Sequence, residues 1–191
     1  MKHLAVCAFA SVGLIWAALC CSQPASEPRG DLSPLPAILK ALGGRWELSV
    51  KFEPASGLPK GTEGRGVETW RAAVQERTLL TEESWKAGSV DMSLLGILWW
   101  DGKSGRLHAM DCNNQGKSTC DPKDAAESVV VDWNGTELSI AEPERGPGGK
   151  LVTSRVTFKD IHADSFTELD ALETSPGQFQ TMMTIHAHRA H

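Results

Sequence analysis

The sequence predicts an all-β protein, folded as an up-and-down antiparallel β-barrel of about eight to ten strands with a short N-terminal helix. Two observations predict this fold. Apolar and polar residues alternate with a period of two along most of the chain, as they do from Arg45 to Phe52, and this is the pattern of half-buried strands. Turn residues recur at short intervals, which favours a meander of neighbouring strands. An open two-sheet sandwich is the alternative architecture.

The elements follow one another in a simple order. Residues 34–42 are predicted to form a short helix that ends at Gly43 and Gly44, since glycine commonly follows the last helical turn. Asn134-Gly135 is the strongest hairpin signal, because a type I′ turn requires positive φ at two positions. No second helix is expected. The predicted strands are 45–52, 63–72, 76–86, 92–100, 105–112, 127–133, 136–142, 150–159, 164–172 and 179–189.

The beginning of the chain indicates export. A short basic start is followed by an uncharged apolar run from Leu4 to Leu19, which is typical of a signal peptide and short for a membrane span. We therefore divide the chain into a signal peptide (1–21), a flexible Pro/Ser-rich linker (22–33) and one barrel domain (34–191).

Two fates of the signal peptide are open. Cleavage near Ser22 or Ala25 would release a soluble protein. Lipidation at Cys21 or Cys20 would instead leave a lipoprotein anchored to the membrane. Either route places the protein outside the cytoplasm, in the periplasm or secreted.

The net charge and the cysteine content restrict the possible partners and the cellular compartment of the protein. The net charge of −5, without a basic stripe, argues against a nucleic-acid partner. Of the five cysteines, only Cys112 and Cys120 lie well beyond the signal region. An even pair in an oxidising compartment predicts a disulfide that closes a short loop, with two free thiols as the alternative.

Three segments carry a family resemblance. They are Leu42-Gly43-Gly44-Arg45-Trp46, the turn from Trp100 to Leu107, and a last strand that ends in Arg189. Together they resemble the bacterial lipocalin-like domains of unknown function, which are calycin-type β-barrels. The resemblance implies that Trp46 packs at the barrel floor with Arg189 laid across it. Strand parity agrees, because Arg189 shares a face with Phe179, Met183, Ile185 and Ala187.

A barrel predicts an interior lined by alternate side chains. On 164–172, Glu168 and Asp170 share a face with Phe166 and Leu172, and if that face is internal the two acids would be buried with raised pKa values. If Leu169 and Ala171 face inward instead, the acids are solvated. His108 is interpreted as a wall residue. The aromatic candidates for the lining are Trp70, Trp85, Trp99 and Trp133.

Catalytic and metal-binding signatures are missing from the sequence. It contains no nucleophile elbow, phosphate loop or His-Glu-x-x-His motif, so we expect no cofactor and no catalytic metal. His186, His188 and His191 should lie outside the barrel, where metal binding would be adventitious. Asp121, Asp124 and Glu127 are interpreted as a solvated acidic loop.

Residues 92–100 break the alternation, because they are apolar on both faces of the predicted strand. Their outer face should be covered by the helix 34–42, by a second copy of the chain in a homodimer, or by a membrane.

The sequence favours an exported protein that binds a small apolar molecule inside the barrel. One alternative is an enzyme in the same barrel that uses Glu168, Asp170 or His108 as acid or base on a lipid-like substrate. The other is an envelope lipoprotein whose 94–100 surface docks a protein partner.

Overall fold

The computed structural model describes residues 33–59, 61–115, 120–146 and 149–190. The expected signal peptide, most of the linker, the two candidate lipidation cysteines Cys20 and Cys21, and His191 lie outside the described residues. Within the described part of the chain, no helix has both the length and the hydropathy needed to cross a membrane.

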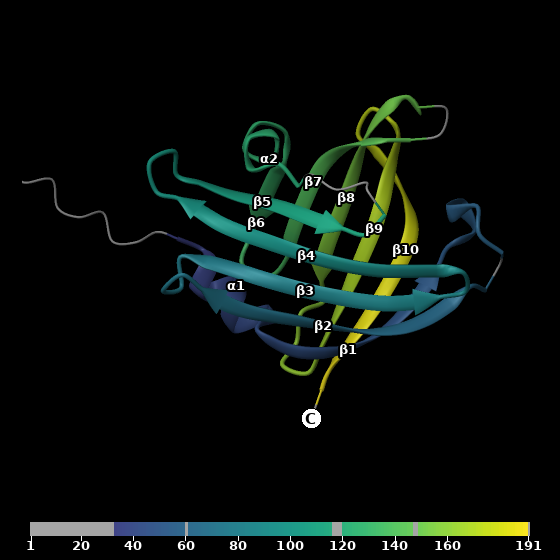
Figure 1. Cartoon of the computed structure of the whole chain (residues 1–191), viewed down its shortest axis with the longest axis horizontal. Coiled ribbons are helices and arrows are strands. Elements are labelled where there is room, and N and C mark those ends of the chain that lie inside the picture. The colour runs from purple at the N-terminus through teal and green to yellow at the C-terminus, as the bar shows by residue number, and fades with distance from the viewer. Residues whose placement is uncertain (1–32, 60, 116–119, 147–148, 191) are drawn as a thin grey trace, which may run out of the picture. The chain divides into compact units, whose positions relative to one another are not determined.

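Ten antiparallel strands form one sheet, as predicted (Figure 1). The strands are β1 (Gly44–Phe52), β2 (Glu63–Ala73), β3 (Thr78–Ala87), β4 (Val90–Asp101), β5 (Arg106–Asn113), β6 (Val130–Trp133), β7 (Leu138–Arg145), β8 (Leu151–Lys159), β9 (Ser165–Ser175) and β10 (Gln178–Arg189). Every strand pairs with its neighbour in sequence except β5 and β6, and β1 pairs with β10. The first and last strands therefore join the two halves of an up-and-down barrel.

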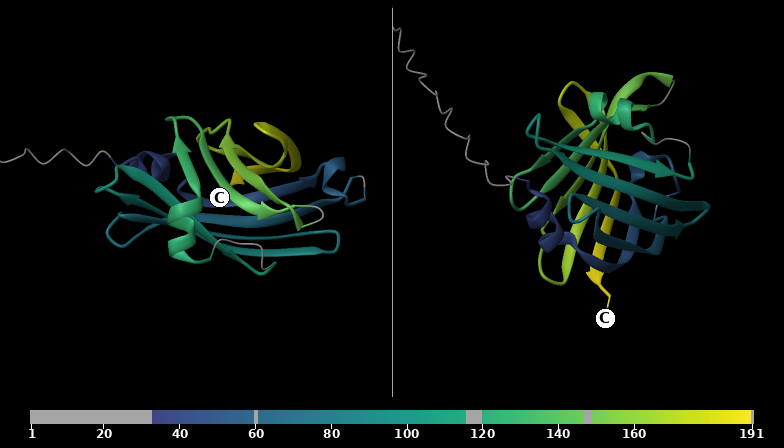
Figure 2. Two further views of the ribbon diagram at one scale, coloured as in Figure 1. Left: turned by 90° about the horizontal axis from the view of Figure 1, so that it is seen from above. Right: turned by 60° about the vertical axis from the view of Figure 1, so that its left-hand side comes forward.

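The barrel is nearly closed, and its seam lies between β5 and β6. These edge strands contact each other without forming a ladder among the described residues. A disulfide between Cys112 on β5 and Cys120 in the segment that joins the two strands confirms the predicted pairing, and the same segment contains a helix α2 (Pro122–Ser128). Figure 2 shows α2 beside the seam. The disulfide indicates an oxidising, extracytoplasmic environment.

One end of the barrel is closed by the helix α1 (Leu35–Leu42), which packs against β2, β3 and β4. Its apolar residues Leu35, Ile38 and Leu42 are fully buried. The carbonyl of Leu42 accepts a hydrogen bond of 2.7 Å from the indole Nε1 of Trp46 on β1. The helix predicted at 34–42 is thus present, and it joins the barrel core through the first strand. A short 3₁₀ helix, η1 (Pro54–Ser56), follows β1.

Two details differ from the sequence-based predictions. The acidic segment is not a simple loop, because Asp121 caps α2 by accepting a hydrogen bond of 2.8 Å from the backbone N–H of Lys123. The strand predicted from residue 127 therefore begins only at Val130. Phe179 does not share a face with Arg189, because a register shift between Thr181 and Met183 reverses the parity of β10. Phe179 packs instead under the guanidinium of Arg155, 3.7 Å away.

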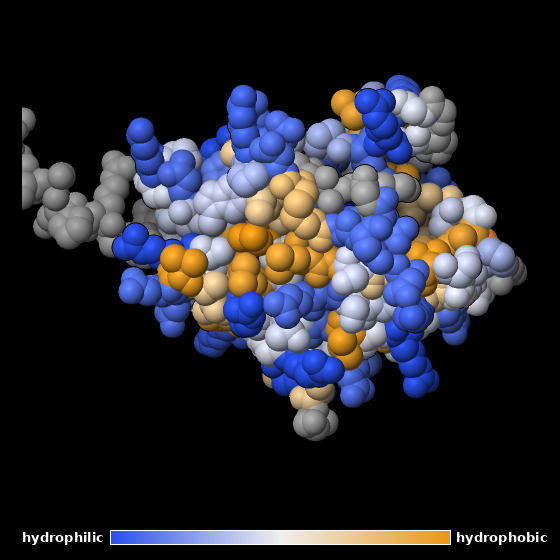
Figure 3. Space-filling view, in the orientation of Figure 1, coloured by the Kyte–Doolittle hydropathy of each residue, from blue (hydrophilic) through white to orange (hydrophobic). Residues whose placement is uncertain are grey.

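The outer face of β4 stays partly open. Leu94, Gly96 and Leu98 face the interior, so Leu95 and Ile97 point outward. α1 does not cover Leu95, which is 39 % exposed. Figure 3 shows apolar side chains gathered over the middle of the face that β4 and β5 form.

Candidate functional site

The barrel encloses an internal cavity of about 90 Å³. Seven strands contribute to its wall, and most of the lining side chains are apolar. The largest are Trp70 on β2 and Phe158 on β8, whose rings meet edge to face with centroids 5.3 Å apart. The apolar lining is completed by Leu94, Leu98, Ala109, Met110, Val129, Ile140 and Val156.

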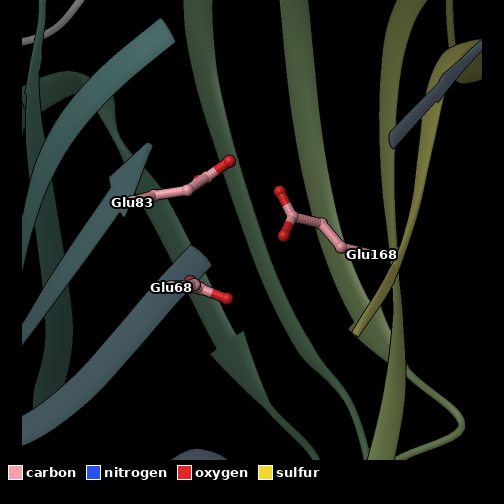
Figure 4. A group of neighbouring side chains, drawn as sticks. All are labelled: Glu68, Glu83 and Glu168. Atoms are coloured by element: carbon pink, nitrogen blue, oxygen red, sulfur yellow. The ribbon is translucent and has the colours of Figure 1, made fainter. Parts of the chain in front are cut away.

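Three glutamates meet in this cavity. Glu68 lies on β2 and Glu83 on β3, and the two residues are direct cross-strand partners. Glu168 projects from β9 on the opposite wall, and Figure 4 shows the three carboxyl groups directed toward one another. One carboxylate oxygen from each residue lies within 4.8 Å of the other two. The exposed fractions are 1 % for Glu68, 9 % for Glu83 and 4 % for Glu168. We call these residues the glutamate cluster.

Local sequence explains how the cluster forms. Inward positions recur every second residue, so Glu68 and Trp70 share the interior face of β2 while Thr81, Glu83 and Trp85 share that of β3. Glu68 Oε1 accepts hydrogen bonds from Trp70 Nε1 at 2.6 Å and from Thr81 Oγ1 at 2.9 Å. These two donors hold the Glu68 carboxylate in place.

Space beside Thr81 depends on a glycine. Gly96 on β4 lines the cavity, and a Cβ atom at this position would lie 2.4 Å from Cγ2 of Thr81. A larger residue would therefore displace Thr81, a hydrogen-bond donor to Glu68.

Burial shifts the protonation of the cluster. Desolvation raises the pKa of Glu68 to about 7, against the opposing effect of the hydrogen bonds from Thr81 and Trp70. Desolvation and the neighbouring charge of Glu68 raise the pKa of Glu83 to about 8. The pKa of Glu168 is raised well above its usual value by desolvation and by Glu83. Glu68 and Glu83 therefore bind and release protons close to neutral pH.

A wider chamber of about 430 Å³ continues the cavity to the barrel mouth, since both share Leu94, Asp111, Glu142 and Val156. Its lining includes the apolar residues Phe52, Trp85, Met92 and Met183. Asp170 also lines it, and desolvation together with Glu83 raises the pKa of this carboxyl to about 8. The wider chamber thus adjoins the cavity that holds the glutamate cluster.

The predicted lining residues fall into four groups. Trp70 and Glu168 line the inner cavity, and Trp85 and Asp170 line the outer chamber. Trp133 lies at a surface hollow beside Trp100. Trp99 and His108 lie on the other side of the sheet, with their rings stacked at a centroid distance of 5.2 Å. Parity explains this placement, because their neighbours Leu98 and Ala109 face inward.

Glu68 and Glu83 were not predicted from the sequence. The signal was present, because Glu68 shares a strand face with Trp70, and Glu83 shares one with Trp85 and Leu79. The strand-face parity that made Glu168 a candidate applies equally to both residues.

The fold and the cavity define this protein as a nearly closed antiparallel β-barrel with an acidic interior chamber. No protein-family model and no curated protein matches the sequence. Among solved structures, the chain is similar to Rv2717c from M. tuberculosis, with a TM-score of 0.54 and 16 % identity over 84 % of this chain and 100 % of that one. It also matches EF1p2_mFAP2b, solved bound to DFHBI, with a TM-score of 0.44 and 10 % identity over 83 % of this chain and 100 % of that one.

The similarity to Rv2717c supports the barrel fold, in agreement with the fold predicted from the sequence. Membership of a lipocalin-like sequence family stays a prediction.

Proposed function

We propose that this protein binds a small organic molecule inside its barrel, with its apolar body against the apolar lining of the chamber and a polar group at the glutamate cluster. The observation that carries the proposal is the chamber itself, which runs from an open mouth to buried carboxyl groups between apolar walls. Pockets of this kind, largely apolar with a few convergent polar groups, are typical of ligand sites.

The test is native mass spectrometry of the mature protein purified from its own cell envelope, followed by denaturing mass spectrometry of the same sample. We expect a non-covalent adduct in the native spectrum that is lost on denaturation. An adduct-free protein, recovered from cells without dialysis, would contradict the proposal.

A cavity-filling variant locates the bound molecule. Ala109→Phe places a ring in the inner cavity, because Ala109 lines it and is 3 % exposed. We expect this variant to lose the adduct. Ser84→Phe adds the same ring at an exposed position of β3 and should retain the adduct.

An enzyme that performs acid–base chemistry in the same cavity is a second candidate. It is favoured by one observation, the pKa values of Glu68 and Glu83 near neutrality, because acids and bases work best when their pKa lies near the working pH. Incubation with the recovered ligand separates the two functions: a binding protein returns it unchanged, whereas an enzyme converts it, and Glu83→Gln abolishes that conversion.

We also propose that the chain is exported and that residues 94–100 form a contact between two copies. The denaturing mass shows whether the chain is cut near Ser22 or Ala25, or carries lipid on Cys21 or Cys20. Size-exclusion chromatography of the wild type and of Leu95→Lys tests the contact, because a charge at this exposed position should dissociate a dimer.

A further inference from the structure

The chamber is strongly acidic. Seven carboxylic acids line its two parts, and among the described lining residues there is no lysine, arginine or histidine. The acids are Glu68, Glu83, Asp111, Glu142, Glu144, Glu168 and Asp170. A wall lined by negatively charged groups attracts cationic ligands and disfavours anions. A fatty acid or another carboxylate is therefore a poor fit for this interior.

Two oxygens of the glutamate cluster are buried without a hydrogen-bond partner in the described residues. They are Oε2 of Glu68 and Oε2 of Glu168. Buried polar atoms in folded proteins almost always have a hydrogen-bond partner. Each of these two oxygens therefore lacks a donor that a ligand could supply. Both side chains are directed into the cavity from opposite walls (Figure 4). The missing donor thus belongs between them.

The spacing of the oxygens fits a single ammonium group. An ammonium nitrogen makes hydrogen bonds of about 2.8 Å to carboxylates, and two acceptors in a tetrahedral arrangement around it are then about 4.6 Å apart. The oxygens of the glutamate cluster lie within 4.8 Å of one another. One nitrogen can therefore reach an oxygen of Glu68, Glu83 and Glu168 together.

We propose that the ligand of this barrel is an organic amine whose ammonium group donates hydrogen bonds to Glu68, Glu83 and Glu168, with its hydrocarbon part directed toward the mouth. This inference rests on the proposed function and names the chemical class of the ligand. The rings of Trp70 and Phe158 line the same cavity, and aromatic faces stabilise a desolvated cation further.

The apolar wall favours an amine over a metal ion. Calcium takes six to eight oxygen ligands, and magnesium keeps several waters. Around the glutamate cluster, the wall instead presents Leu98, Phe158, Ala109, Val156 and Ile140. These residues suit the carbon chain of an amine and supply no oxygen ligand from their side chains.

Amine binding should release protons at neutral pH. The ammonium group favours the charged form of the carboxyls, whose pKa values burial raises. The titratable groups that face the chamber are Glu68 from β2, Glu83 from β3, Asp111 from β5, Glu142 and Glu144 from β7, and Glu168 and Asp170 from β9. Affinity should therefore fall as the pH is lowered from 8 to 5.

The experiment is isothermal titration calorimetry of the mature protein with probes that share a hexyl chain: hexylamine, hexan-1-ol, hexanoate and hexyltrimethylammonium. We expect hexylamine to bind at least about tenfold more tightly than each of the others. Hexyltrimethylammonium carries the charge without N–H donors, so it separates hydrogen bonding from charge. Titrations in phosphate and in HEPES, neither of which contains a primary amine, measure proton release, because the two buffers differ in ionisation heat.

Two variants test the residues. Glu168→Gln should weaken hexylamine at least about tenfold and leave hexan-1-ol within about twofold. Glu82→Gln is the matched control for Glu83→Gln, because Glu82 is the outward neighbour and pairs with Arg71 at the surface. We expect hexylamine affinity to fall in Glu83→Gln and not in Glu82→Gln. Should Glu168→Gln fail to fold, the comparison of Glu83→Gln with Glu82→Gln still tests the proposal.

Several results would overturn the inference. Binding of hexan-1-ol or hexanoate as tight as that of hexylamine would do so, and would leave the proposed function standing. The inference would also be overturned if the protein binds calcium, manganese or zinc chloride but not hexylamine, and if Glu168→Gln abolishes this metal binding. The inference would also be overturned if none of the four probes binds. The proposed function is tested separately, by the adduct in the native mass spectrum.

Discussion

The guanidinium of Arg189, on the last strand, lies 4.1 Å from the ring centroid of Trp46 on the first. Arg189 also donates hydrogen bonds to the carbonyls of Gly43 at 2.8 Å and Ala163 at 2.7 Å. In the sheet, Trp46 and Arg189 are direct partners. The pairing implied by the family resemblance is thus confirmed, and it fastens the first strand to the last at the end of the barrel that α1 closes.

Gly44 should be intolerant of any side chain. Its φ of +119° is unfavourable for other residues, and a Cβ atom there would lie 2.5 Å from Nη1 of Arg189. We expect Gly44→Ala to lower the free energy of unfolding by at least about 2 kcal/mol. Urea denaturation followed by tryptophan fluorescence measures this loss.

Gly57→Ala is the matched control, because Gly57 also has a positive φ, +76°, yet a Cβ atom added there would have no other atom within 4 Å. This variant should cost about 1 kcal/mol, the penalty for the backbone conformation alone. Equal losses in the two variants would show that the approach of Arg189 to Gly44 adds nothing.

Strand alternation was enough to predict the barrel, because a period of two survives wherever one face of a strand is buried. It failed where local chemistry changes the period. In β10, the register shift next to Met183 reverses the parity, so Phe179 lies on the outside. At 121–128, Asp121 and Pro122 begin a helix that was not predicted, because the acidic residues of this segment are typical of a solvated loop.

The glutamate cluster was harder to predict than the fold. Glu168 was recognised as a candidate by its strand face, yet its partners Glu68 and Glu83 lie about 100 and 85 residues earlier in the sequence. Only closure of the sheet brings β9 opposite β2 and β3. Which of the two faces of 164–172 points inward could not be decided from that strand alone, because apolar residues occur on both faces.

Stability should fall as the pH rises toward 8. The ordinary pKa of glutamate, 4.5, rises in the folded protein to about 7 for Glu68 and about 8 for Glu83. Between these values the folded state binds more protons than the unfolded state, so the free energy of unfolding decreases with pH. The stabilisation is complete below pH 4.5 and is lost above about pH 8.

Glu168→Gln should reverse part of this loss, because it removes one charge from the glutamate cluster. We expect the variant to be more stable than the wild type at pH 8.5 by on the order of 2 kcal/mol, or roughly 5 °C in Tm. The difference should narrow toward pH 5. Thermal unfolding by circular dichroism at several pH values checks this, and parallel pH profiles for the two proteins would contradict it.

Thr81→Val should raise the pKa of Glu68 further. The Thr81 hydroxyl donates a hydrogen bond to the charged form of Glu68, and this bond lowers the pKa. Carboxyl ¹³C NMR of selectively labelled glutamates measures the titration directly. Thr69→Val is the control, because Thr69 lies between Glu68 and Trp70 on the opposite face of β2. A shift of similar size in both variants would rule out the role of the hydroxyl.

The disulfide should stabilise the barrel at its seam. Cys112 and Cys120 close a loop of short sequence separation where β5 and β6 meet without a ladder. Loop-closure entropy predicts that the double variant Cys112→Ser, Cys120→Ser loses about 2–3 kcal/mol of unfolding free energy. Urea denaturation of the oxidised wild type, the reduced wild type and the double variant measures it. The reduced wild type should match the variant, because both lack only the cross-link. If all three proteins unfold at the same urea concentration, packing of α2 and the edge strands closes the seam without the disulfide.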